Sequence, residues 1–252
     1  MAGLLCDDKG IPVSIEIFPG STTDTKTFSN QIKKTATDFG CQKVTFVGDR
    51  GMIKNKQIEE LRENEFHYIT GISKAQIQKL IRTGVFQLGL FEVNLCEVKY
   101  EGERYILRYN PVRAEEMKAV RLEKQKTIKK YIKGKNEYLK EHPRAKIEVA
   151  LEKANSKIKQ LKANKWLFVE EKGRKLILQI DREKLNKAEE LDGCYCLKTD
   201  LPASVSKNTV HNRYKDLALV EQAFRASKTI NLEMRPWYVI TEQSSRGRAL
   251  II

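Results

Sequence analysis

One carboxylate follows an apolar run so closely that a core strand would carry it at its tip. The run covers residues 43–48, and Asp49 comes directly after it. Arg50 stands beside this acid, and the glycines Gly48 and Gly51 flank the pair. A buried strand that ends on an acid next to an arginine marks Asp49 as a candidate for chemistry.

A second acid lies in a helical segment, 206–228. Glu221 stands seven residues after Tyr214 and seven before Lys228, so in one helix the three side chains would lie nearly on one line. A carboxylate between a tyrosine and cations, beside an apolar stripe, suits an acid that enters a cleft. The stripe comprises Leu217, Val220 and Phe224, which we expect to be buried. A simpler explanation stays open, in which Glu221 is a surface residue paired with Arg225 at i+4 for roughly 0.2–0.5 kcal/mol.

The elements that must position Asp49 are expected in the first 72 residues. Apolar alternation predicts strands, helical spacing predicts helices, and glycine or turn residues separate them. The expected order is strand 3–6, turn 8–10, strand 13–17, helix 24–39, strand 43–48, a short helix near residue 58 and a strand from residue 66. This order predicts a mixed α/β core.

The middle of the chain is more basic. The pattern of residues 112–161 predicts a long helical region that is interrupted at His142-Pro143. Residues 113–165 contain 17 Lys or Arg and 7 Glu. A hairpin at 166–180 and a strand at 194–197 are expected to follow. The lysines either keep a helical hairpin solvated or track the phosphates of a nucleic acid. Both explanations stay open at this point.

The whole composition favours a polyanionic partner. The 252 residues have a net charge of +14 and a sequence pI of about 9.5. No apolar run is long enough to predict a spanning helix, and no signal peptide is recognised. Five scattered cysteines and three separate histidines favour neither a disulfide framework nor zinc chemistry. We expect a reducing, cytoplasmic location.

Several segments together resemble a known family, the DDE transposases of bacterial insertion sequences. The insertion-sequence-4-like branch carries a last motif written Tyr-x2-Arg-x3-Glu-x6-Lys. Tyr214, Glu221 and Lys228 fit that spacing, whereas Leu217 stands at the Arg position. Other segments look like family segments in family order: "GIPVSIEIFPGSTTDTKTF", "VGDRGM", "LDGCYCLKTD" and "YKDLALVEQAFRASK".

The resemblance implies a ribonuclease-H-like α/β fold. A mixed sheet core would carry a large basic α+β insertion before the final catalytic helix. Residues 1–72 would form the N-terminal part of the core, 73–200 the insertion, and 201–252 the catalytic-Glu helix and tail.

The resemblance also implies site residues and a cofactor. Asp49 and Glu221 would be the second and third carboxylates of a triad that binds Mg²⁺ or Mn²⁺, because such ions take hard oxygen ligands. Two ions would activate a water or a 3′-hydroxyl for attack on a phosphodiester. The flanking glycines would let a DNA backbone approach. DNA phosphates would be held by Arg50, Tyr214, Arg225 and Lys228, with Arg213 or Arg225 replacing the arginine lost at Leu217.

The chain departs from the family pattern at both ends, and we expect it to be truncated there. The family's first catalytic Asp lies on a strand upstream of the two that open this chain, so that strand and that acid are expected to be missing. Asp7 and Asp8 lie in a hairpin turn, and turn chemistry explains them. We therefore expect a transposase fragment that does not complete strand transfer alone.

Other functions and partners stay open. A non-catalytic remnant would still bind DNA through the basic insertion, with salt-sensitive affinity. Residues 112–161 could instead pair with another chain, although their apolar spacing does not sustain a heptad. The partners implied by the resemblance are transposon ends, target DNA, and a second copy or a separate N-terminal fragment, with no membrane.

Overall fold

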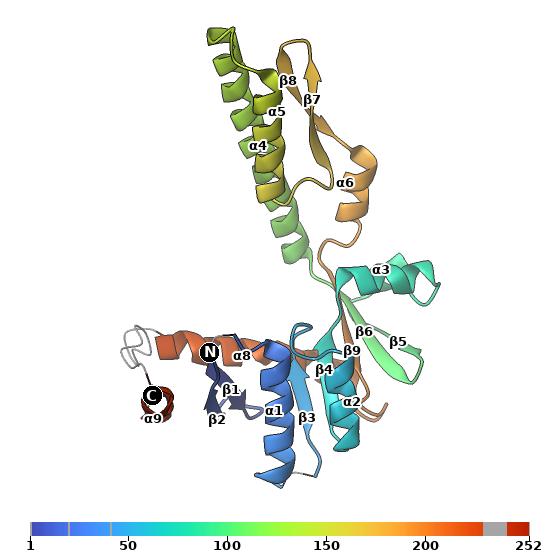
Figure 1. The fold of residues 1–252 in the computed structure, drawn as a ribbon. Coiled ribbons are helices and arrows are strands. Elements are labelled where there is room, and N and C mark those ends of the chain that lie inside the picture. Colours follow the sequence, from blue (N-terminus) through green and yellow to red (C-terminus); the bar gives the residue numbers. More distant parts are fainter. Residues whose placement is uncertain (1, 20, 41, 229–240, 252) are drawn as a thin grey trace. The chain divides into compact units, whose positions relative to one another are not determined.

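The computed structural model describes residues 2–19, 21–40, 42–228 and 241–251. The chain divides into two compact units. The first unit comprises residues 1–108 with 195–252, and the second comprises residues 109–194. Figure 1 shows the elements of both.

The first unit opens with an antiparallel hairpin of β1 (Ala2–Cys6) and β2 (Pro12–Ile17). Asp7 closes its turn, because its Oδ1 accepts hydrogen bonds from the backbone nitrogens of Lys9 (2.9 Å) and Ile11 (2.8 Å). The predicted hairpin is therefore confirmed. It forms a two-stranded sheet of its own.

A five-stranded sheet carries the rest of the first unit, in the order β3-β4-β9-β6-β5. The strands β3 (Thr45–Gly48) and β4 (His67–Gly71) are parallel, and β9 (Cys194–Thr199) runs antiparallel to β4. The pair β5 (Cys96–Tyr100) and β6 (Glu103–Tyr109) is antiparallel. This mixed sheet confirms the predicted mixed α/β class.

Two helices, α1 (Asp24–Thr37) and α2 (Asn55–Glu63), bury their apolar sides against β3 and β4. Phe28 of α1 meets Phe46 of β3 edge to face, with ring centroids 5.4 Å apart. The same helix also reaches the hairpin, since Lys34 Nζ lies 2.9 Å from Ser14 Oγ. The shared cluster comprises Phe28, Ile32, Phe46, Ile53, Ile58, Leu61, Phe66 and Tyr68.

The helices α3 (Lys74–Arg82) and η1 (Leu88–Phe91) connect β4 to β5. Ser73 and Gln76 begin α3 with a capping box, in which each side chain bonds the other's backbone nitrogen. Neither helix is predicted from the apolar pattern. Residues 73–108 and 195–200, which belong to the expected insertion, thus add β5, β6 and β9 to the sheet of β3 and β4.

The segment 206–228 is not one helix, which corrects the sequence prediction. It forms α7 (Lys207–Lys215) and α8 (Leu217–Lys228), and Asp216 interrupts them. The Leu219 nitrogen bonds the Asp216 carbonyl only three residues back, at 2.9 Å, and the Asp216 carboxylate lies 3.6 Å from Arg213 Nη1. Aspartate competes with helical hydrogen bonding through its side chain, which explains the break.

The predicted apolar stripe on this segment is only half-buried. Leu217, Val220 and Phe224 of α8 all keep part of their surface in solvent. Val210 of α7 is instead fully buried, against Ile69 of β4 and the other apolar side chains of the sheet. A last helix, α9 (Glu242–Ile251), contacts β2.

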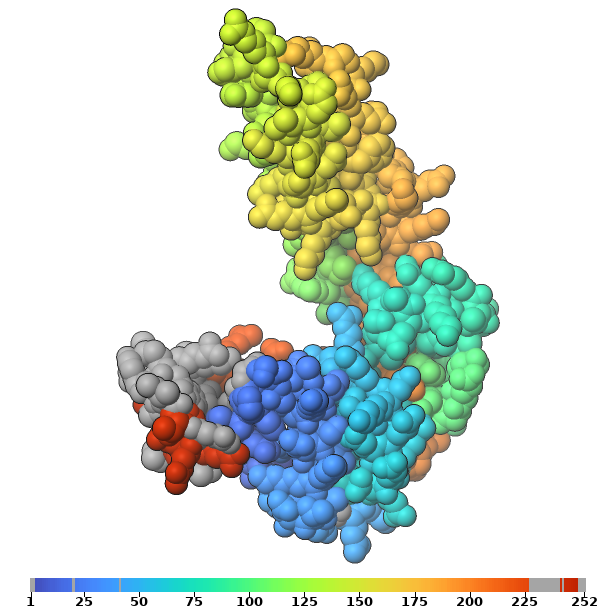
Figure 2. All heavy atoms as spheres, in the orientation of Figure 1, coloured from blue at the N-terminus to red at the C-terminus, as the bar shows by residue number. Residues whose placement is uncertain are grey.

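The second unit has a separate core. It consists of α4 (Pro111–Glu141), α5 (Ile147–Gln160), the hairpin β7 (Leu167–Lys172) and β8 (Lys175–Ile180), and α6 (Arg182–Glu189). The predicted interruption at His142-Pro143 and the predicted hairpin are confirmed. Figure 2 shows its atoms from green through orange. The core includes Ile128, Ile132, Leu139, Ile158, Trp166 and Leu167.

No helix among the described ranges is long and apolar enough to cross a lipid bilayer.

Candidate functional site

One edge of the five-stranded sheet collects the ends of four strands. Gly48 is in register with Thr70, so Asp49 and Gly71 continue β3 and β4 side by side. The Ile72 nitrogen bonds the Cys196 carbonyl at 3.0 Å, which places the start of β9 next to the end of β4. We call this the sheet edge; it comprises the ends of β3, β4 and β6 and the start of β9.

Asp49 is exposed and its carboxylate shapes the turn that follows β3. Its Oδ1 accepts hydrogen bonds from the nitrogens of Gly51 (2.8 Å) and Met52 (3.0 Å). Its Oδ2 has no hydrogen bond or ion pair within the described residues, so one carboxylate oxygen stays available.

Contacts within the protein explain why glycine occupies the two positions that flank Asp49 and Arg50. A Cβ at Gly48 would lie 2.9 Å from Ile53 Cδ1, and a Cβ at Gly51 would lie 3.1 Å from Asp49 Oδ1. Close packing of the turn therefore accounts for both glycines, and the expectation that they admit a DNA backbone stays a prediction.

Tyr214 of α7 lies over this turn. A Cβ added at Gly71 would come within 2.9 Å of the Tyr214 hydroxyl oxygen, so the hydroxyl sits at the end of β4. Burial raises the pKa of Tyr214, the charge of Asp49 raises it further, and Arg50 lowers it. Three of the predicted site residues, Asp49, Arg50 and Tyr214, therefore gather at the sheet edge.

Glu221 and Arg225 pair with each other on α8. Glu221 Oε2 lies 3.7 Å from Arg225 Nη2, and the two side chains are 73% and 81% exposed. The surface pair considered from the sequence is thus present, and such a pair contributes little to stability. The side chain of Lys228 lies outside the described residues.

A complete metal-binding cluster is not seen. The described part of the chain contains no group of three or more His, Cys, Asp or Glu placed to hold a metal ion. Asp8 and Arg213 pair instead, with Asp8 Oδ2 3.3 Å from Arg213 Nη2. Arg213 is thereby engaged with the hairpin turn, and Asp7 with its own turn nitrogens.

The sequence interpretation missed a polar cluster on the same edge. Arg108 near the end of β6, Tyr195 near the start of β9 and His211 of α7 meet there. His211 Nε2 lies 2.5 Å from the Tyr195 hydroxyl and 2.9 Å from Arg108 Nη1. One signal could have identified it: His211 stands three residues before Tyr214, so both share a face of α7.

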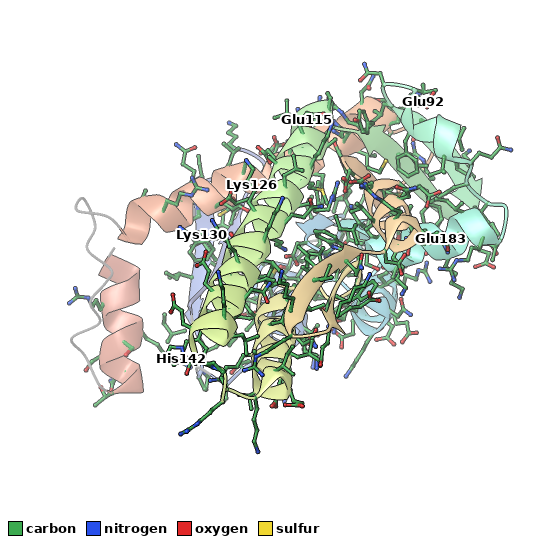
Figure 3. All side chains as sticks on the ribbon, turned by 90° about the horizontal axis from the view of Figure 1, so that it is seen from above. Glu92, Glu115, Lys126, Lys130, His142 and Glu183 are labelled. Carbon is green, nitrogen blue, oxygen red and sulfur yellow. The ribbon has the colours of Figure 1, made fainter. Side chains whose placement is uncertain are left out.

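The second unit contains a basic groove between α4 and the β7–β8 hairpin, with a volume of about 1080 Å³. Its apolar floor includes Ile132 and Leu178, and Glu137 is the acid among its lining residues. Figure 3 shows Lys126 and Lys130 one turn apart on α4; Lys126 lines the groove, whereas Lys130 does not. The cations of the basic groove are Lys126, Lys129, Lys133, Lys140, Lys172, Arg174 and Lys175.

Comparison with protein families gives one match over nearly the whole chain. The family described as "Transposase DDE domain" matches residues 2–251. Comparisons with curated proteins and with solved structures gave no match.

Proposed function

Because the chain belongs to the transposase DDE domain family, we propose that Asp49 and Glu221 are two acids of a phosphodiester-cleaving site used in DNA transposition. The observation that carries the proposal is the position of Asp49 at the end of a parallel strand, with Arg50 and Tyr214 beside it. Ligand sites of α/β sheets form at the carboxyl ends of parallel strands.

The donor set suits a hard divalent cation such as Mg²⁺ or Mn²⁺. Oδ2 of Asp49 is available, and the Glu221 carboxylate is exposed and bonded to an equally exposed arginine. A pair of such ions, once bound to a complete site, would activate the attacking oxygen and stabilise the leaving oxygen. Arg50, Tyr214, Arg225 and Lys228 would position phosphates of transposon ends and target DNA.

A third acid is not offered by the hairpin. The Asp7 carboxylate closes its turn and the Asp8 carboxylate pairs with Arg213. We therefore expect the chain assayed alone to lack strand transfer, and we propose a second copy of the chain or a separate fragment as a further partner. We further propose that the chain belongs to the insertion-sequence-4-like branch and that residues 73–200 form an insertion in its fold. We also propose a cytoplasmic location, where bacterial DNA lies.

The test combines metal binding with nicking of supercoiled DNA. Mn²⁺ binding is measured by calorimetry on the wild-type chain, Asp49→Ala, Glu221→Ala and the control Asp38→Ala, which replaces an exposed acid of the same unit. Both candidate variants should lose Mn²⁺ affinity, and any Mg²⁺-dependent nicking, while Asp38→Ala keeps them. Binding and nicking that survive in both variants would remove these acids from the mechanism.

A second candidate function is DNA binding without catalysis, and the basic groove favours it. Lys126, Lys129 and Lys133 of the groove are exposed on α4, and a row of lysines that neutralises phosphates gives affinity that falls steeply with salt. Replacing Lys126, Lys129 and Lys133 together by Ala should flatten the plot of log affinity against log salt. The control replaces Lys153, Lys159 and Lys165, which are exposed in the same unit but do not line the groove. Equal slopes for the two triple variants would contradict this function.

A further inference from the structure

Three polar side chains from three elements meet at the end of the sheet edge away from Asp49. Arg108 Nη1 lies 2.9 Å from Nε2 and 3.4 Å from Nδ1 of His211, and the Tyr195 hydroxyl lies 2.5 Å from the same Nε2. His211 is only 3% exposed, whereas Arg108 and Tyr195 are half-buried. The buried imidazole thus contacts two side chains that are each only partly buried.

Arg108 carries a positive charge that has no acidic partner in the described part of the chain. Arg104 on the same strand shows the contrast, because its guanidinium binds both carboxylate oxygens of Glu97 at 2.9 Å. Arg108 instead lies within hydrogen-bond distance of the ring nitrogens of His211 and also bonds the Tyr195 side chain, and both of these partners are uncharged side chains. None of the Arg108 nitrogens is a buried atom without a hydrogen-bond partner, so the cluster does not leave this guanidinium buried and unsatisfied.

The surroundings of His211 are also positive. Burial lowers the pKa of His211 first, and the charges of Arg108 and Lys215 lower it further. A neutral imidazole can accept a hydrogen bond, so it can hold the guanidinium without neutralising it. A half-buried arginine with neutral partners favours an anion, and a guanidinium matches the oxygens of a phosphate.

The position of the cluster relates it to Asp49. Along the sheet, the strands follow the order β3, β4, β9 and β6, so Asp49 and Arg108 are three strand spacings apart. Three spacings correspond to about 14 Å, a separation that neighbouring phosphates along one strand of a duplex can bridge. The helix α7 links the two places, because Tyr214 lies near Asp49 and Arg50 while His211, three residues earlier, contacts Arg108.

We propose that Arg108, Tyr195 and His211 form a binding site for one phosphodiester of the DNA backbone, on the same strand-end side of the sheet as the phosphate at Asp49. Arg108 donates hydrogen bonds to the phosphate oxygens, and Tyr195 and His211 are positioning residues that orient its guanidinium. This inference rests on the proposed function, because it takes DNA as the ligand.

The experiment measures binding of the full chain to a duplex oligonucleotide by fluorescence anisotropy, in EDTA so that no metal chemistry occurs. Single phosphates of one strand are replaced in turn by uncharged methylphosphonates. The wild-type chain should lose affinity about 10-fold at one position of the scan. In Arg108→Ala, that position should cost no further affinity, overall affinity should fall about 10-fold, and the salt slope should decrease by about one.

Two variants and one control separate this role from a structural one. Arg108→Lys should keep the salt slope, because it keeps the charge. Tyr195→Phe should bind the unmodified duplex about three-fold more weakly, through a weaker contact with the phosphate at the same scan position. Its thermal stability should be unchanged. Arg82→Ala, which removes an exposed arginine of α3, should leave the methylphosphonate pattern unaltered.

The outcomes distinguish this proposal from the proposed function. A scan with the same sensitive position in the wild-type chain and in folded Arg108→Ala overturns the phosphate site, and so does a wild-type chain that does not bind the duplex. Nicking that requires Asp49, together with unchanged binding by Arg108→Ala, would refute the site and leave the proposed function intact. Nicking that does not require Asp49, together with weaker binding by Arg108→Ala, would refute the proposed function and leave the phosphate site intact.

Discussion

The two cationic regions of the molecule hold their charges in different ways. At the sheet edge, Arg108 is half-buried and bonded to a buried histidine. Along the basic groove, Lys126, Lys129 and Lys133 are exposed on one helix. A charged side chain that is fixed by packing and hydrogen bonds can fix the position of one phosphate. Exposed, mobile charged side chains add affinity for DNA without fixing where along the DNA the protein binds.

The comparison extends to how each unit uses polar groups for stability. In the first unit, buried polar side chains connect distant segments, as Tyr68 does when its hydroxyl donates to Glu103 Oε2 at 2.6 Å. In the second unit, apolar packing of α4, α5 and the hairpin supplies the core. We therefore expect single polar substitutions to be costly in the first unit and mild in the second.

The largest effect is expected for Arg104→Ala. Arg104 is 5% exposed and, besides Glu97, donates to the carbonyls of Leu201, Pro202 and Val205. Removing one partner of a buried ion pair leaves the other unpaired, so the free energy of unfolding should fall by about 3–5 kcal/mol. Urea denaturation followed by circular dichroism measures this.

The matched variant is Arg113→Ala in the second unit. Arg113 is exposed and pairs with Glu116 at i+3, so its loss should change the free energy of unfolding by less than about 0.5 kcal/mol. Similar losses of unfolding free energy in Arg104→Ala and Arg113→Ala would contradict the expected difference between the two units.

The second effect concerns alkaline pH. Burial raises the pKa of Tyr105 on β6 to about 12. The folded protein therefore holds this proton more tightly than the unfolded chain, whose tyrosines titrate near pH 10. The stabilisation is complete below about pH 10 and is lost as the pH rises to about 12, amounting to about 2–3 kcal/mol.

Urea denaturation between pH 8 and 11 measures the first half of this loss. Tyr105→Phe should reduce the decline of the free energy of unfolding with pH. A Trp237→Phe background leaves Trp166, which is buried in the second unit, as the single tryptophan, and its fluorescence should respond less to pH. An equal decline with and without Tyr105 would contradict the assignment.

A smaller effect is expected for Asn136→Ala in the second unit. Asn136 of α4 bonds both backbone groups of Leu176, accepting from its nitrogen at 2.8 Å and donating to its carbonyl at 2.9 Å. Its loss should cost about 1–2 kcal/mol and speed hydrogen exchange at the Leu176 amide. Gln125→Ala, which changes another polar residue of the same groove, should leave that exchange unchanged.

The smallest effect is expected for Lys133→Ala. Lys133 is 80% exposed, and its Nζ lies 3.9 Å from Glu137 Oε1. The free energy of unfolding should change by less than about 0.5 kcal/mol. A loss above about 1 kcal/mol in denaturation would show that the groove charges also hold the unit together.

Local patterns predicted most elements of this fold, and tertiary contacts explain those that were missed. The hairpin turn at Asp7, the break at His142 and the β7–β8 hairpin follow from turn residues and alternation that act over a few positions. The helix break at Asp216 was missed, because apolar spacing continues across it while the aspartate pairs with Arg213.

The site was predictable in part. The strand-tip position of Asp49 follows from the apolar run before it, and the family resemblance implied that Tyr214 belongs to the same site, whereas the nearness of the two side chains is seen in the structure. The cluster of Arg108, Tyr195 and His211 was not, because its members lie up to 103 positions apart and each type is common by itself.

The sequence by itself determined the basic middle, the family and the placement of an acid directly after a strand, since charge, motif and apolar alternation are local properties of the chain. Only the tertiary structure decided which strands are neighbours and therefore which side chains share an edge. Strand order brings Asp49, Tyr195 and Arg108 to one side of the sheet, and the packing of α7 places His211 and Tyr214 over them. The physical reason is that strand pairing and helix packing depend on burial summed over distant segments, which no short pattern encodes.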